Sequence, residues 1–273
     1  MTESACLEIT VEDFTAETAV GPRAARWVRP GGARPDHARP DASPIVLLHE
    51  GLGSIAQWKD FPERLARATG HAVLAYDRQG YGKSPALTET RGIRYLHDYA
   101  LLELPAVLEA CGVEAPPILF GHSDGGSIAL LYAAHLPTRA LITEAAHVFV
   151  EDISVAGIRD ARHAWKTTDL AARLAKYHGT KTEQIFFAWA DTWMTDWFRD
   201  WNIEAEIQSI TCPSLILQGE DDEYGTAAQV RAIVNRIGPT AQGNLIPDCR
   251  HIPHFQAGEV VLGATRHFLQ EAL

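Results

Sequence analysis

Short apolar segments alternate with longer amphipathic ones along most of this 273-residue chain. This alternation restricts the possible folds more than any other feature. The apolar runs favour buried strands at residues 45–49, 71–77, 117–121, 140–145, 214–219 and 244–247. The segments between them favour helices at residues 55–68, 95–111, 127–135, 225–237 and 259–271. The pattern predicts an α/β fold, with a mostly parallel central sheet and helices on both faces.

Two regions depart from the alternation. Near the start, residues 7–11 and 26–29 favour antiparallel edge strands, and residues 30–44, rich in Pro, Gly and Arg, favour a loop. Residues 147–208 are mostly helical in pattern and contain no strand signal. We interpret them as a lid inserted into a core domain made of residues 1–146 and 209–273.

Tryptophan is concentrated in the predicted lid. Four of the rings follow one another at intervals of four residues, which predicts that they share one slowly rotating helical face. Such a stripe either attaches the lid to the core or lines an apolar pocket, and both roles stay open. The five tryptophans of the lid are Trp165, Trp189, Trp193, Trp197 and Trp201.

Charge and cysteine usage exclude several classes of function. The formal net charge is -11, which repels nucleic acid and anionic membrane surfaces, so neither is an expected partner. Residues 1–13 carry four acidic residues and do not have the pattern of a secretory signal, so we expect none, and we expect no segment apolar enough to span a bilayer. The four cysteines lack the spacing of a metal site or a disulfide framework. We expect a cytoplasmic protein that is a monomer or a homodimer. The cysteines are Cys6, Cys111, Cys212 and Cys249.

The segment at residues 121–126, Gly-His-Ser-Asp-Gly-Gly, stands between a buried strand and an apolar helix. A tight strand-to-helix turn leaves no room for side chains at its flanks, which explains Gly121 and Gly125. The turn exposes the Ser123 hydroxyl at a helix N-terminus, where developing negative charge is stabilised. This context predicts that Ser123 is a nucleophile.

A nucleophilic serine needs a base and an acid that orients the base. The strand at residues 214–219 is followed by a run of acidic residues that begins Glu220-Asp221-Asp222, and the last strand is followed by His251. Both loops emerge at the sheet edge that carries Ser123, where open α/β sheets place their sites. We therefore expect His251 as the base, with His254 as the fallback, and Asp221 or Asp222 as the acid. Cys249 is interpreted as a buried thiol.

Acyl transfer also needs hydrogen-bond donors for the oxyanion. The segment after the first core strand, His49-Glu50-Gly51-Leu52-Gly53, has glycines that let backbone amides face the site. We expect the amides of Gly51 and Asp124 to fill this role. A carboxylate at Glu50 opposes an oxyanion unless it is paired or turned away. The residues expected to bind substrate are Glu50, Leu52, His122, His147, Trp189 and Trp193.

Taken together, these motifs resemble the α/β-hydrolase superfamily over essentially the whole chain. The resemblance is carried by residues 49–53, the segment Asp-Arg-Gln-Gly-Tyr-Gly-Lys-Ser at 77–84, residues 121–126, residues 219–222 and His251. In that family the acid usually stands three residues after the glycine, which selects Asp222. The family's usual His-Gly pair is replaced here by His49-Glu50. The resemblance implies a helical lid over an apolar pocket and no cofactor.

The predicted activity is hydrolysis of carboxylic esters of small apolar or aromatic substrates through an acyl-enzyme, by a carboxylesterase-like serine hydrolase. Serine at position 123 disfavours the dehalogenases and epoxide hydrolases of this fold, which have aspartate there. Rivals with the same triad are C–C bond hydrolases of ring-cleavage products, perhydrolases and acyltransferases, and a non-catalytic ligand receptor is an alternative of another class.

A dinucleotide site and a metal site are two alternatives to a hydrolase site. The glycines at 51 and 53 resemble a dinucleotide-binding turn, but Glu50 would stand beside the pyrophosphate. No carboxylate or third histidine stands near His251 and His254 in sequence at ligand spacing, so no metal is expected.

Overall fold

The computed structural model describes residues 8–31 and 43–273. The described residues form one eight-stranded sheet in the order β1-β2-β4-β3-β5-β6-β7-β8. Strands β3 to β8 run parallel, and β1 and β2 join antiparallel at one edge, so the predicted α/β fold is confirmed. The strands are β1 (Ile9–Thr18), β2 (Gly21–Pro30), β3 (Ile45–Leu48), β4 (Val73–Tyr76), β5 (Ile118–His122), β6 (Ala140–Glu144), β7 (Ser214–Gly219) and β8 (Ala241–Ile246).

The edge hairpin is much longer than the sequence pattern predicts. Strands β1 and β2 pair over their full lengths, from Ile9 opposite Pro30 to Thr18 opposite Gly21. Most of β1 is exposed and polar, so it carries little hydrophobic periodicity to detect. Ion pairs between β1 and β2, including Asp13 with Arg26, contribute contacts across this exposed hairpin. Residue 7 and residues 32–42 of the predicted strand and loop lie outside the described residues.

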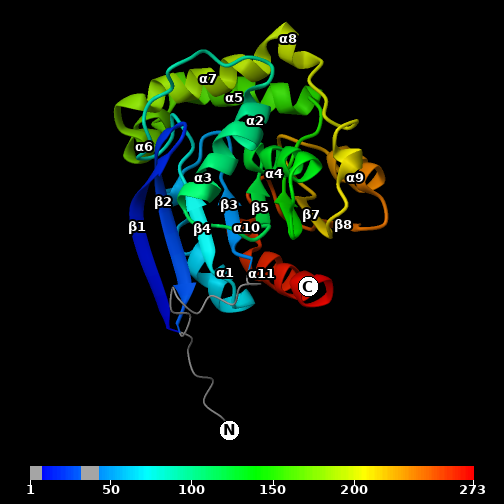
Figure 1. The fold of residues 1–273 in the computed structure, drawn as a ribbon. Helices are drawn as coiled ribbons and strands as arrows, with labels where there is room; N and C mark the ends of the chain where they lie inside the picture. The colour runs from blue at the N-terminus through cyan, green and yellow to red at the C-terminus, as the bar shows by residue number, and fades with distance from the viewer. Residues whose placement is uncertain (1–7, 32–42) are drawn as a thin grey trace.

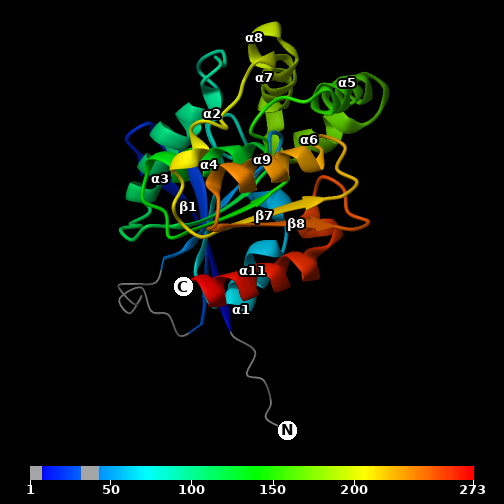
Figure 2. The ribbon, with the colours of Figure 1, turned by 90° about the vertical axis from the view of Figure 1, so that its right-hand side faces the viewer.

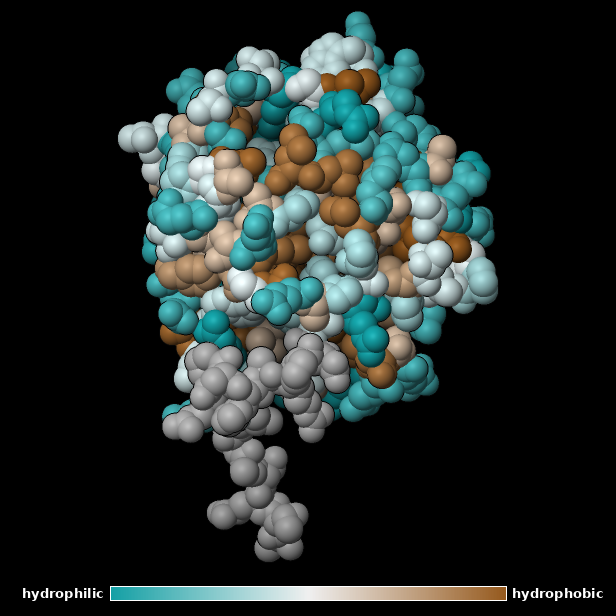
Figure 3. Space-filling view, viewed as in Figure 1, coloured by the Kyte–Doolittle hydropathy of each residue, from teal (hydrophilic) through white to brown (hydrophobic). Residues whose placement is uncertain are grey.

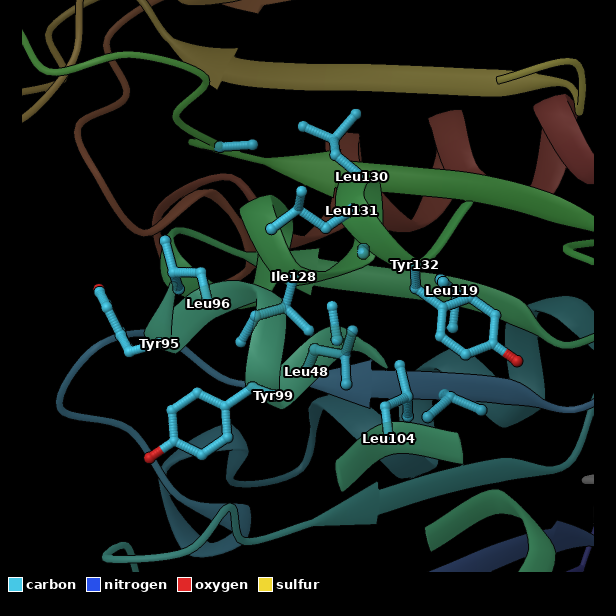
Figure 4. Packing of buried hydrophobic residues seen from close by; sticks show 14 of the residues in the cluster. Leu48, Tyr95, Leu96, Tyr99, Leu104, Leu119, Ile128, Leu130, Leu131 and Tyr132 are labelled. Carbon is cyan, nitrogen blue, oxygen red and sulfur yellow. The ribbon is translucent and has the colours of Figure 1, made fainter. Parts of the chain in front are cut away.

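Helices cover both faces of the sheet, as Figures 1 and 2 show. Every residue of β3, β4, β5 and β6 is buried. Successive side chains of these strands point to opposite faces of the sheet and pack into two apolar cores. Figure 4 shows Ile128 and Leu131 packed near Leu48 in the larger of these cores. One face carries α1 (Phe61–Thr69) and α11 (Gly258–Ala272), and the other carries α2 (Tyr95–Asp98), α3 (Leu104–Ala110), α4 (Asp124–His135) and α9 (Ala227–Ile237).

The helical stretch predicted at residues 95–111 is present but not uniform. A π-helical turn, Tyr99–Glu103, separates α2 from α3. Pro105 follows this turn, and proline lacks the amide hydrogen that continues a regular α-helix. The wider turn places Glu103 against Arg23, with 2.7 Å between carboxylate and guanidinium, and this buried ion pair joins the helix to the edge hairpin.

Four α-helices lie between β6 and β7 and sit beyond the carboxyl ends of the strands, at the top of Figures 1 and 2. They fall within the predicted lid at residues 147–208, and the division of the chain into a core and a lid domain stays a prediction. The helices are α5 (Asp152–Thr167), α6 (Leu170–His178), α7 (Thr182–Met194) and α8 (Asp196–Arg199).

The predicted tryptophan stripe is wrong in part. Trp189 and Trp193 are buried on α7, but the helix ends at Met194 because Thr195 has an extended backbone. Trp197 lies on the separate helix α8, where it is 45% exposed, and Trp201 follows that helix. The interval of four residues between Trp193 and Trp197 therefore crosses the end of α7 and the start of α8. Spacing along the sequence does not reveal that boundary.

The surface has no extended apolar face in the view of Figure 3, where hydrophobic residues are mixed with hydrophilic ones and a small hydrophobic group lies near α2. None of the helices in the described ranges combines the length and apolar character needed to cross a bilayer.

Candidate active site

The sharp turn at Ser123 is the centre of the candidate site. Ser123 has φ 54° and ψ -118°, a strained left-handed conformation between β5 and α4. A side chain at Gly121 would place its Cβ 2.2 Å from the carbonyl oxygen of Gly125, and one at Gly125 would place its Cβ 2.0 Å from that of Leu48. The two glycines are therefore required by close backbone packing, as the sequence predicts.

The structure brings Ser123, His251 and Asp222 together in one hydrogen-bonded chain. His251 Nε2 lies 3.0 Å from Ser123 Oγ, and His251 Nδ1 lies 2.8 Å from Asp222 Oδ1. With Nδ1–H donating to the carboxylate, the lone pair of Nε2 faces the serine hydroxyl and is placed to accept its proton. These are the three residues that the sequence singles out for the triad.

The environment keeps Asp222 ionised. Burial raises the pKa of this carboxyl, but His251, the Tyr224 amide and His147 together lower it more, so the pKa lies below its ordinary value. The Tyr224 amide also donates to Asp222 Oδ1 over 2.8 Å. Asp221 is exposed and has no contact with His251, which leaves Asp222 as the acid of the chain.

Two alternatives to this arrangement fail on geometry. His254 is buried and its Nδ1 pairs with the Glu144 carboxylate, so it does not face Ser123. Cys249 is 1% exposed, and burial raises the pKa of its thiol to about 11. A buried thiol that stays protonated is a poor nucleophile, in agreement with its interpretation from sequence.

The two residues whose backbone amides are expected to hold an oxyanion, Gly51 and Asp124, are neighbours and line the same cavity. Asp124 is the first residue of α4, and a Cβ at Gly51 would lie 3.4 Å from Asp124 Cγ. Neither amide is paired with an acceptor within the ranges that the structure describes. The loop is held by its carbonyls instead, because Gly51 O accepts from Tyr81 Oη at 2.9 Å and Glu50 O accepts from Arg78 Nη2 at 2.7 Å.

Glu50 is paired with His122, which resolves the conflict between a carboxylate and an oxyanion. His122 Nδ1 lies 3.5 Å from Glu50 Oε2, and His122 Nε2 donates to the carbonyl of His251 over 2.8 Å. Burial lowers the pKa of His122, but Glu50, Glu144 and the His251 carbonyl together outweigh burial and raise the pKa to about 9. For Glu50 the two effects have the opposite signs. Burial raises the pKa of its carboxyl, but His122 and His49 outweigh burial and hold the pKa well below its ordinary value. The pair is therefore ionic at neutral pH.

A cavity of about 230 Å³ opens at Ser123. The expected residues Glu50, Leu52, His147, Trp189 and Trp193 line it. The expectation for His122 is corrected, because its side chain is fully buried behind the nucleophile and does not reach the cavity. The lining residues that sequence reasoning missed are Gln57, Ser154, Ile158, Leu174, Tyr224 and Ile252.

A signal for the missed residues exists only in part. Ile158 and Leu174 are buried positions on the amphipathic helices α5 and α6, and Tyr224 stands two residues after the acid. Their helices could be predicted, but the face that each one turns to the cavity depends on how the helices pack.

A second cluster of ionisable groups lies under the nucleophile. Candidate ligand atoms of His122, Glu144 and His254 all lie within 4.8 Å of one another. Spacing along the sequence does not reveal this cluster, because its residues come from three separate elements, β5, β6 and α10 (Pro253–Gln256). Glu144 accepts from both the amide and Nδ1 of His254, and His122 Nε2 donates to the His251 carbonyl, whereas His122 Nδ1 makes no hydrogen bond and lies 3.5 Å from Glu50 Oε2. We therefore describe the cluster as a buried, hydrogen-bonded pair of Glu144 and His254 beside His122.

Known proteins share this architecture. The enol-lactonase from Burkholderia xenovorans LB400 superposes with a TM-score of 0.72 at 19% identity, covering 94% of this chain and all of that one. A thermophilic esterase from Thermogutta terrifontis superposes with a TM-score of 0.69 at 18% identity, covering 96% of this chain and 99% of that one. At such identities the likeness shows the fold alone.

Two known proteins with similar sequences match most of this chain. A proline iminopeptidase of Lactobacillus delbrueckii subsp. bulgaricus is 23% identical over 79% of this chain and 86% of its own length. The sn-1-specific diacylglycerol lipase ABHD11 of Mus musculus is 22% identical over 82% of this chain and 80% of its own. The model of the alpha/beta hydrolase family matches residues 45–264, which include every residue of the hydrogen-bonded chain at Ser123. This protein therefore belongs to the alpha/beta hydrolase family, and it is a hydrolase.

Proposed function

We propose that this hydrolase is a serine esterase that cleaves carboxylic esters of small apolar or aromatic compounds. Ser123 attacks the ester carbonyl while His251 takes its proton, and the amides of Gly51 and Asp124 hold the oxyanion. His251 then protonates the leaving alcohol, and the same residues hydrolyse the acyl-enzyme with water. Asp222 orients His251 and stabilises its protonated form.

One observation carries the proposal. The Ser123 hydroxyl, both nitrogens of His251 and the Asp222 carboxylate form one hydrogen-bonded chain that opens into a cavity. The hydrogen bonds are short enough for proton transfer without rearrangement. The unpaired amides beside Ser123 supply the second requirement of acyl transfer.

The cavity supports a small apolar acyl or alcohol group. Its walls are formed largely by Trp189, Trp193, Ile158 and Leu174. A volume of about 230 Å³ is small beside the ~300–1,000 Å³ of sites for drug-sized ligands. We therefore expect short acyl chains or single aromatic rings to fit best.

The first experiment is hydrolysis of p-nitrophenyl esters from acetate to decanoate by the parent protein and by Ser123→Ala. The proposal expects an optimum among the shorter chains, and a loss of several orders of magnitude in kcat with the serine removed. A fluorophosphonate probe should label the parent and leave Ser123→Ala unlabelled. Ester hydrolysis that persists in the variant would contradict the assignment of Ser123.

A peptidase activity is the second candidate, because a relative at 23% identity is named a proline iminopeptidase. L-Proline p-nitroanilide therefore belongs in the substrate panel. Turnover of the anilide at a higher kcat/KM than that of every ester would favour a peptidase. Labelling without turnover of esters or anilide would favour C–C bond hydrolysis, perhydrolysis or acyl transfer, and no labelling at all would favour a non-catalytic receptor.

A further inference from the structure

Two polar groups of the cavity have unused hydrogen-bonding capacity. The first is the indole N–H of Trp189, a residue that is only 8% exposed. Its nitrogen has no acceptor within the described ranges and keeps some accessible surface, and the ring lines the cavity. The indole lies directly over the oxyanion loop, because a Cβ at Gly51 would lie 2.6 Å from Nε1.

The second group is the carboxylate of Glu50. Its side chain is 24% exposed, lines the same cavity and has His122 at 3.5 Å as its only side-chain partner in the described part of the chain. The carboxylate is held in place against Gly53, where a Cβ would lie 2.2 Å from Oε2. A carboxylate can accept about four hydrogen bonds, so most of its capacity is free.

The donor and the acceptor belong to neighbouring parts of one wall. Trp189 covers Gly51, and Glu50 is the residue before it in the chain. A substrate group that satisfies both must accept one hydrogen bond and donate another. A hydroxyl does both, whereas an ammonium only donates and a ketone or carboxylate only accepts.

The local charge also favours a neutral group. The negative charge of Glu50 is balanced by the positive charge of His122, so the wall offers a cation no uncompensated counter-charge. The wall also offers an anion no uncompensated positive charge, because the indole N–H is uncharged.

We propose that the cavity recognises hydroxylated acyl groups, with the Trp189 indole donating to the substrate hydroxyl and the Glu50 carboxylate accepting from it. This inference rests on the proposed esterase function and narrows its substrate class. The lid thus contributes a polar contact, through α7, in addition to apolar surface.

The test compares methyl butanoate with the enantiomers of methyl 2-hydroxybutanoate and methyl 3-hydroxybutanoate. Each kcat/KM is divided by the rate constant for hydroxide-catalysed hydrolysis of the same ester, which removes the intrinsic reactivity of the carbonyl. The parent protein should prefer at least one hydroxy ester over methyl butanoate by about 10- to 100-fold, as expected for a hydrogen bond to a charged group.

Three variants locate the effect. Trp189→Phe keeps a ring but removes the N–H, and should lower the preference about threefold to tenfold. Glu50→Gln removes the charge and should lower it at least fivefold. Trp193→Phe is the matched control, because Trp193 lines the same cavity while its N–H already donates to Tyr95 Oη at 2.8 Å. It should leave the preference unchanged.

The outcomes separate the inference from the function on which it rests. Hydrolysis of p-nitrophenyl esters by Ser123 without a hydroxy-ester preference overturns the inference and leaves the esterase proposal standing. A preference that survives in both Trp189→Phe and Glu50→Gln also overturns the inference. Absence of ester hydrolysis and of phosphonate labelling overturns the esterase proposal and the inference together.

Discussion

The buried pair of Glu50 and His122 should make the stability of the fold depend on pH. His122 titrates near pH 6.5 when it is unpaired, and its pKa in the folded protein is raised to about 9. A raised pKa means that the folded state binds the proton more tightly than the unfolded state. The resulting stabilisation is fully present below about pH 6.5, and it is lost as the pH rises through 9.

The magnitude follows from the two pKa values. Their difference corresponds to about 3 kcal/mol in the free energy of unfolding. Replacing His122 by Gln removes the titrating group and keeps an amide that can donate to the His251 carbonyl. The free energy of unfolding of the parent, relative to that of His122→Gln, should therefore fall by about 3 kcal/mol between pH 6 and pH 10.

Urea unfolding followed by circular dichroism at pH 6, 8 and 10 measures this difference. The control is His267→Gln, because the His267 side chain is 72% exposed and lies on the surface of α11. Its difference from the parent should stay nearly constant over the same range. A gap between the parent and His122→Gln that is equal at pH 6 and pH 10 would refute the reasoning, because it would show that His122 carries no charge in the folded protein.

Three further predictions concern the site. Asp222→Asn should lower kcat on the best p-nitrophenyl ester by about 10³–10⁴-fold with little change in KM, because His251 loses the acid that fixes its tautomer; steady-state kinetics would contradict this with a loss below tenfold. Gly125→Ala should destabilise the fold and abolish activity, because its Cβ meets the Leu48 carbonyl at 2.0 Å; an unchanged melting temperature would count against that contact. Cys249→Ala should keep kcat within about threefold, since its thiol is buried and protonated, and a loss comparable to that of Ser123→Ala would reverse this view.

Much of the site could be predicted because its chemistry lies at strand ends. Ser123, Asp222 and His251 each follow a short apolar run, and parallel strands bring their carboxyl ends to one edge. The close-packed turn at Ser123 also leaves a mark in the sequence, since its two flanking glycines are required by backbone contacts. The identity of these residues could therefore be inferred without tertiary coordinates.

The rest depends on packing that has no periodic signature. Glu144 is the last residue of a buried strand, and nothing in the sequence around it indicates a partner more than 100 residues away at His254. His122 is among the residues expected to touch substrate, yet its ring is fully buried and its Nδ1 lies 3.5 Å from Glu50 Oε2. The predicted strands of the edge hairpin are shorter than the observed ones, because polar strands at a sheet edge lack hydrophobic alternation.

The insertion of α5 to α8 into the single connection between β6 and β7 has a consequence for how such a protein can diversify. The loops that carry Ser123, Asp222, His251 and Gly51 all lie outside that connection, whereas Trp189 and Trp193 lie within it. The residues of the hydrogen-bonded chain and part of the cavity wall are thus encoded by separate segments of the sequence. Recombination that exchanges only the inserted stretch can present a new wall to an unchanged set of reacting groups.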